Sequence, residues 1–165
     1  MRLNGLVAAA VAAAVWALAG CDPQRIAKLE EGVATEADVR REFGEPAAVF
    51  NQVDGARVFE YPRQPEGQTN YFITIGTDGK MSALRQVLKP SEFAKVTPGM
   101  DKAEVRKLLG KPAKTQRFDL EPDEEHWEWR WLEAQQARLF SVTFDRDGKV
   151  TTSASSDDLR DAARN

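Results

Sequence analysis

A sequence repeat divides most of the 165-residue chain into two parts of similar length. Residues 26–33 recur as residues 93–100 at an offset of 67, and residues 35–47 recur as residues 101–113 at an offset of 66. This period is longer than the periods typical of solenoid proteins. The sequence therefore predicts a duplicated domain, in which both copies begin with the same helix and turn signals.

Each copy contains the start and stop signals of one short helix. Thr35 and Asp101 are typical N-cap residues, and an acid follows each of them three positions later, as in a capping box. Gly44 and Gly110 stand at the predicted ends of the two helices, and a proline follows each glycine two residues later. We predict that these glycines adopt a left-handed conformation and stop the helices.

Segments of alternating polarity follow each predicted helix. The predicted strands are residues 47–53, 57–61, 70–75 and 81–88 in the first copy and residues 115–120, 125–132, 138–144 and 149–153 in the second. An Asp-Gly pair separates the last two strands of each copy and predicts a hairpin turn. We therefore predict an α+β fold: a tandem repeat of short helices followed by an antiparallel β-meander, with the helices on one face of a sheet of up to eight strands.

The amino-terminal segment resembles the signal peptide of bacterial lipoproteins. Leu18-Ala19-Gly20-Cys21 matches the lipobox and ends an alanine-rich apolar stretch that is too short for a transmembrane helix. The resemblance implies cleavage between Gly20 and Cys21 and acylation of Cys21 with chains such as palmitate. Two or more acyl chains hold a protein stably on a membrane. A buried N-terminal helix with an incidental cysteine is the alternative.

These signals predict four parts: a signal peptide at residues 1–20, a first repeat at 21–89, a second repeat at 90–155 and a C-terminal tail at 156–165. After cleavage the chain is still long enough to bury a core, in one domain or in two fused halves. The tail is predicted to form a frayed terminal helix.

The composition excludes several classes of function. The formal net charge is −3 and the chain has no basic stripe, so we expect no nucleic acid partner. Cys21 is the only cysteine, which excludes disulfides and cysteine-based metal sites. His126 is the only histidine, and we predict that its side chain is solvated and has no chemical role. We therefore expect no catalytic residue, cofactor or metal ligand, and we predict that the protein is not an enzyme.

Acidic residues are concentrated between Asp119 and Glu125, on both sides of Pro122. Such a run is typical of a solvated hairpin loop. A general acid–base pair and a carboxylate-based calcium site are the weaker alternatives. The calcium alternative lacks the regular ligand spacing and the glycine of an EF-hand loop.

Three tryptophans, Trp127, Trp129 and Trp131, alternate along one predicted strand and therefore share one face of it. Each ring can bury on the order of 150 to 250 Å², too much for all three to be exposed on a monomer. The cluster is therefore either core or an interface, and Trp131, Trp129 and Trp127 are the candidate partner contacts. Trp127 and Trp129 align with aromatic residues of the first copy and are predicted to be mainly packed. Trp131 aligns near Arg63 and is the predicted exposed partner contact.

The second copy resembles the SmpA/OmlA family of lipoproteins, which includes a lipoprotein component of the outer-membrane β-barrel assembly machinery. The resemblance is carried by the segments Gly99–Val105, Leu109–Pro112, Trp127–Trp129 and Phe144–Val150. The first copy is a weaker match, and the tandem arrangement resembles that of β-lactamase inhibitor proteins. The resemblance implies a protein partner in the cell envelope, with the β-barrel assembly machinery as the expected one.

We therefore predict a non-catalytic envelope lipoprotein that faces the periplasm and acts by protein interaction, in outer membrane protein assembly or envelope maintenance. The alternative is an inhibitor-like module that docks its sheet on an envelope enzyme. We expect a lipid anchor in the outer membrane. Asp22 follows Cys21 and resembles the inner-membrane retention signal of enterobacterial lipoproteins, so the inner membrane is the alternative location.

Overall fold

The computed structural model describes residues 22–162. The elements are α1 (Asp22–Ile26), α2 (Glu36–Phe43), β1 (Ala48–Asn51), β2 (Arg57–Pro62), β3 (Asn70–Ile75), β4 (Met81–Gln86), α3 (Pro90–Phe93), α4 (Lys102–Leu109), β5 (Lys114–Phe118), β6 (Glu121–Glu133), β7 (Gln136–Phe144), β8 (Val150–Asp157) and α5 (Leu159–Ala162). The predicted signal peptide, the cleavage site at Gly20 and Cys21, and the last three residues of the predicted tail lie outside the described residues. Among the described helices, none has the length and apolar character needed to cross a membrane.

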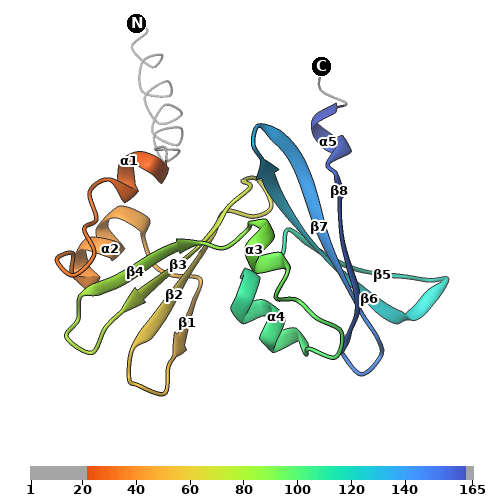
Figure 1. The fold of residues 1–165 in the computed structure, drawn as a ribbon, viewed down its shortest axis with the longest axis horizontal. Helices are drawn as coiled ribbons and strands as arrows, with labels where there is room; N and C mark the ends of the chain where they lie inside the picture. The colour runs from red at the N-terminus through yellow and green to blue at the C-terminus, as the bar shows by residue number, and fades with distance from the viewer. Residues whose placement is uncertain (1–21, 163–165) are drawn as a thin grey trace, which may run out of the picture.

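The protein is mostly antiparallel β, so the predicted α+β fold class is wrong. Strands β1–β4 form one four-stranded sheet and strands β5–β8 form another, in place of one broad sheet with helices on one face. Between β4 and β5 the chain folds into α3 and α4, which lie between the two sheets (Figure 1). This placement separates β4 from β5. The longest described helices, α2 and α4, have only 8 residues each.

Both faces of the first sheet are buried. One face contributes Phe59 and Ile73 to a core that also contains Val39 of α2. The opposite face contributes Val58 and Phe72 to the larger core, which also contains α4 and the second sheet. The first sheet therefore packs against α2 on one side and against the second half of the chain on the other.

Helices α2 and α4 begin at the predicted capping boxes. The side chains of Thr35 and Asp101 each accept a hydrogen bond from the backbone N–H three residues later, and the acid at that position accepts one in return. Gly44 and Gly110 end the helices with φ values of 82° and 75°. Their ψ values of −163° and −169° are extended, so the predicted left-handed conformation is replaced by a positive-φ conformation that is almost exclusive to glycine.

The second sheet is covered on one face only. Its inner face packs the tryptophan strand β6 against α3 and α4. Every residue of the edge strand β8 after Val150 is exposed. Strand β8 also extends to Asp157, beyond the predicted strand at 149–153, before α5 begins. The second half of the chain therefore ends in an open sheet edge.

A buried polar cluster joins α4 to the first sheet. The Glu60 carboxylate on β2 is fully buried and accepts hydrogen bonds from Arg106 Nε at 3.2 Å and Nη2 at 2.8 Å. The Asn70 side-chain amide on β3 donates to the carbonyl oxygens of Leu109 at 2.7 Å and Lys111 at 3.0 Å. These bonds satisfy backbone carbonyls at and just beyond the end of α4. The two halves therefore share a polar junction as well as an apolar core.

Candidate interaction site

The three tryptophans of β6 are not an exposed contact surface. Trp131 is 3% exposed, so its predicted exposure is wrong. The reason is Phe93 of α3, whose ring meets the Trp131 ring edge-on at 5.0 Å between centroids. Trp129 is fully buried and donates from Nε1 to the Gly110 carbonyl oxygen at 3.0 Å. Trp127 is half-buried and packs against Phe144 at 4.9 Å between ring centroids.

An apolar groove of about 360 Å³ opens beside the first sheet. Its apolar lining includes Phe50, Val58 and Phe72, one from each of β1, β2 and β3. Two exposed cations also line it: Arg85 of β4 and Lys107 of α4. Neither cation forms an ion pair with another residue of the described range. The groove therefore combines an apolar surface with two positive charges that can meet an acidic partner.

An exposed apolar side chain contributes to the groove lining. Val53, in the turn between β1 and β2, lines the groove and is completely exposed. Apolar side chains on a surface beside a groove are typical of a protein contact when they form one patch. No sequence pattern indicates this patch, because Phe50 and Val53 belong to an ordinary alternating strand and its turn.

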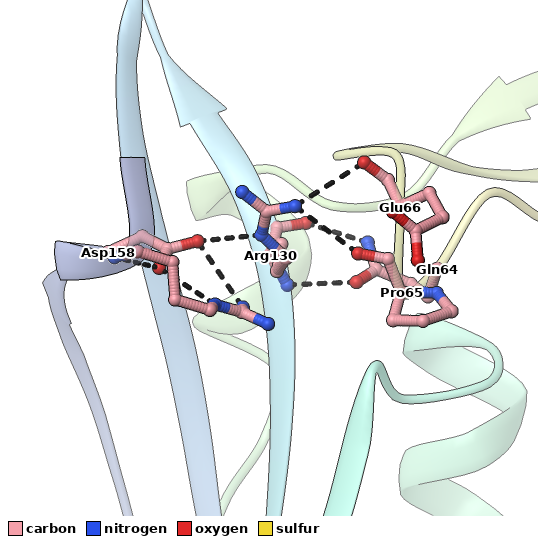
Figure 2. Close-up of polar contacts among 6 residues, drawn as sticks. Gln64, Pro65, Glu66, Arg130 and Asp158 are labelled. Carbon is pink, nitrogen blue, oxygen red and sulfur yellow. Dashed lines mark hydrogen bonds and ion pairs between the residues drawn. The ribbon is translucent and has the colours of Figure 1, made fainter. Parts of the chain in front are cut away.

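Arg130 fastens the β2–β3 loop to the second sheet (Figure 2). Pairing between β5 and β6 reaches only Glu128, which leaves the backbone of Arg130 open on that edge. The Gln64 side chain fills the edge: its Nε2 donates to the Arg130 carbonyl at 2.8 Å and its Oε1 accepts from the Arg130 N–H at 3.1 Å. The guanidinium of Arg130 donates from Nη1 to the carbonyls of Pro65 and Glu66, both at 3.3 Å.

The same guanidinium donates from Nε to Asp158 at 2.6 Å, just before α5. Asp158 is 5% exposed. Burial opposes its charged form, but hydrogen bonds from Arg160 and Arg130 hold the pKa of Asp158 below its ordinary value. A charged side chain buried with this many partners is well satisfied. This cluster is therefore a structural clamp between the two halves.

The acidic run between Asp119 and Glu125 is not only a solvated loop, because residues 121–125 belong to strand β6 and Glu125 has several partners. Glu125 lies 2.8 Å from Lys102 Nζ and 2.8 Å from Arg117 Nη2, and it accepts a hydrogen bond from Trp127 Nε1 at 2.6 Å. The hydrogen bond from Lys102, followed by those from Arg117 and Trp127, lowers the pKa of Glu125 to about 2 against the opposing effect of burial. Glu125 therefore pins the hairpin to α4.

His126 is not the freely solvated side chain that the sequence predicted. Its side chain is 19% exposed, and Nδ1 lies 3.1 Å from the Thr143 hydroxyl on β7. Its Nε2 is shielded from solvent and lies 3.6 Å from Glu121 and 3.7 Å from Glu124. The structure therefore brings His126 together with Glu121 and Glu124. These residues are close in the sequence, but the sequence does not show that their side chains converge.

Comparison with known proteins identifies one part of the chain. The family described as "Outer membrane protein assembly factor BamE domain" matches residues 86–154. The osmotically inducible lipoprotein OsmE, a solved structure, is 26% identical, covers 43% of this chain and 75% of its own, and has a TM-score of 0.38. A DUF4309 family protein, YjgB, from Bacillus subtilis subsp. subtilis strain 168 is 18% identical, covers 79% of this chain and 82% of its own, and has a TM-score of 0.31. No curated protein matches the chain.

The family match covers the polar end of β4, helices α3 and α4, and most of the second sheet. It confirms the resemblance predicted from the motifs of the second copy. The match does not extend to the first copy, so the duplication stays a prediction. Residues 86–154 of the chain therefore match the BamE domain family.

Proposed function

We propose that the protein is a non-catalytic envelope lipoprotein that binds a protein partner in outer membrane protein assembly. The observation that carries this proposal is the BamE domain at residues 86–154. The candidate contact surface is the groove beside the first sheet, where the second half contributes Lys107. A partner segment with an apolar side chain next to an acid would fill the apolar surface and pair with Arg85 and Lys107.

The proposed anchor is Cys21, acylated after removal of residues 1–20. Helix α1 begins at the next residue, Asp22, whose carboxylate accepts hydrogen bonds from Arg63 Nε and Nη2 at 3.0 to 3.2 Å. Ile26, at the end of α1, packs against the core of the first half. An anchor at Cys21 would therefore be joined to the folded body without a linker, and we propose that it lies in the outer membrane.

The duplication supports a boundary between a first repeat at 21–89 and a second at 90–155. Each half has a capping box, and an isolated β-bridge joins the N-cap residue to the strand after the last hairpin turn: Thr35 to Lys80 and Asp101 to Lys149. We infer that the halves arose as copies and that the second kept the family's sequence pattern. The first copy then supplies the groove.

A photo-crosslinking amino acid at Val53 tests the proposal in cells. Val53 is fully exposed and lines the groove, so substitution there leaves the fold intact and puts the crosslinker against a bound partner. We expect an adduct with a component of the outer-membrane β-barrel assembly machinery, identified by mass spectrometry. The adduct should weaken in the Arg85→Glu variant, because the substitution repels an acidic partner. If the crosslinker at Val53 forms no adduct with a component of this machinery in the wild-type background, the proposal is contradicted.

The inhibitor-like alternative uses another surface. The edge strand β8 is exposed from Thr151 onward and could pair with an envelope enzyme. A crosslinker at Ala154, which is exposed on β8, samples that edge. An adduct with an envelope enzyme from Ala154, with none from Val53, would favour the inhibitor-like function over the assembly function.

A further inference from the structure

A histidine and two glutamates converge on one point near the turn of the β5–β6 hairpin. Glu121, Glu124 and His126 each direct one ligand atom to a space in which all three atoms lie within 4.8 Å of one another. All three residues come from β6, where a register shift between Gln116 and Phe118 of the paired strand disturbs the regular alternation. In a regular strand, Glu121 would lie on the opposite face from Glu124 and His126, because side chains alternate. The irregularity accompanies the convergence of all three.

The electrostatics of this cluster favour a bound cation. Among the described residues, no lysine or arginine pairs with Glu121 or Glu124, and the basic group near each acid is His126. Glu125, which lies between Glu124 and His126 in the sequence, forms the ion pairs with Lys102 and Arg117. Two carboxylates that share a space without a counter-ion repel each other, and a divalent cation between them removes the repulsion.

The histidine supplies an independent sign of a ligand. Nε2 of His126 is shielded from solvent and has no hydrogen-bond partner, although a buried polar atom normally has one. The other ring nitrogen is held by the Thr143 hydroxyl at 3.1 Å, on the paired position of β7. With Nδ1 protonated and donating to Thr143, the lone pair of Nε2 points toward the two glutamates, which is the arrangement that orients a metal-ligating histidine.

We propose that Glu121, Glu124 and His126 form a zinc-binding site. Zinc accepts imidazole nitrogen and carboxylate oxygen at about 2.0 to 2.2 Å, so two ligands of a tetrahedral site lie about 3.4 Å apart. Nε2 lies 3.6 Å from Glu121 and 3.7 Å from Glu124, so a small closure of the side chains forms the site. Calcium and magnesium prefer all-oxygen sites, and the imidazole disfavours them.

The surroundings leave the fourth zinc position to water. Glu121 and Glu124 are 57% and 43% exposed, so solvent reaches the ion from the side of the carboxylates. The Phe118 ring packs edge-on against the His126 ring, at 5.1 Å between centroids. A bound zinc ion would fasten the hairpin start at Glu121 to the body of β6. The zinc site does not depend on the identity of the protein partner.

Zinc titration of the full chain in detergent tests the site. We expect one zinc ion per chain by calorimetry, a rise in melting temperature with added Zn²⁺, and a visible absorption band when Co²⁺ replaces Zn²⁺. Glu124→Gln and His126→Gln should each weaken Zn²⁺ binding by at least about tenfold, and Thr143→Val by roughly 10- to 100-fold because it frees the ring. Asp123→Asn, an exposed acid of the same hairpin outside the cluster, is the matched control and should bind as the wild type does.

Three outcomes would overturn the proposal. One is a wild-type chain that neither binds Zn²⁺ nor melts at a higher temperature with it. Another is Zn²⁺ binding that is the same in Glu124→Gln and His126→Gln as in Asp123→Asn. The third is Ca²⁺ displacing Zn²⁺ at equal concentration. The Co²⁺ spectrum keeps the test independent of folding, because a lost band with an unchanged melting curve reports the ligands alone.

Discussion

The Gly110→Ala substitution should destabilise the protein more than Gly44→Ala, although each adds one methyl group. Both glycines end a helix with positive φ and extended ψ, so alanine at either position costs about 1 to 3 kcal/mol of backbone strain. A Cβ at Gly44 would have no atom within 4 Å. A Cβ at Gly110 would lie 3.0 Å from Asn70 Nδ2 and 3.1 Å from Glu60 Oε1.

Those two neighbours cannot move freely. Glu60 and Asn70 are both fully buried, and both are bonded to the end of α4 or to Arg106. Overpacking at such a site costs a further 1 to 3 kcal/mol or so. We therefore expect Gly44→Ala to lose about 1 to 3 kcal/mol and Gly110→Ala about 2 to 6 kcal/mol, at about 2 to 4 °C in melting temperature per kcal/mol.

Urea unfolding followed by tryptophan fluorescence measures both losses, because Trp129 donates to the Gly110 carbonyl and reports this junction directly. The double variant Gly110→Ala with Asn70→Ala adds a second test. Removal of the Asn70 amide relieves the clash, so the double variant should lose less than the sum of the two single losses. Equal losses for Gly44→Ala and Gly110→Ala, with additive losses in the double variant, would refute the packing argument.

Three further predictions concern the core, the anchor and acid stability. Trp131→Ala and Trp129→Ala should each cost about 3 to 5 kcal/mol in urea unfolding, since both rings are buried, and a loss under about 1 kcal/mol for Trp131→Ala would contradict its packing. Cys21→Ser should release the protein from membranes or leave an uncleaved precursor on fractionation, and a cleaved chain that still sediments with membranes would refute the anchor. The lowered pKa of Glu125 stabilises the fold fully above about pH 4.5, and this stability is lost as pH falls toward about 2, because the unfolded chain takes up the proton first. Glu125→Gln should flatten the loss of stability over that pH range in acid unfolding, and an unchanged pH profile would show that the ion pairs with Lys102 and Arg117 contribute nothing.

The sequence predicted the local features of this fold well, because neighbouring residues determine them. The capping boxes at Thr35 and Asp101 depend on a hydrogen bond across three residues, and the helix stops need a glycine whatever surrounds them. The Asp-Gly turns depend on the positive φ of Gly79 and Gly148. Such signals are readable from a single sequence because they involve no distant partner.

The sequence could not predict the features that depend on distant contacts. Charged residues in a strand usually face solvent, but Glu60 is buried because Arg106 and the backbone N–H of Lys111 come from the other half. Trp131 reads as exposed because the first copy has no aromatic residue near that position, while Phe93 of α3 covers it. The division into two sheets follows from the same cause, since apolar residues on the second face of the first sheet draw α4 onto it.

The BamE domain was predicted from its own motifs, since glycines, prolines and tryptophans at fixed spacing lie in one copy. The groove was not predicted. It is formed by residues of β1–β4 together with Lys107 of α4, and the sequence does not show that these strands and this helix meet.

The amount of folded β-barrel protein in the outer membrane tests the central claim most directly. The measurement compares cells that lack this chain with cells that carry the wild-type chain or Cys21→Ser, using the heat-modifiable mobility of barrel proteins on gels. We expect the deletion to lower the amount of folded barrel protein, the wild-type chain to restore it and Cys21→Ser to restore it less. Unchanged barrel levels in the deletion strain would contradict a role in outer membrane protein assembly.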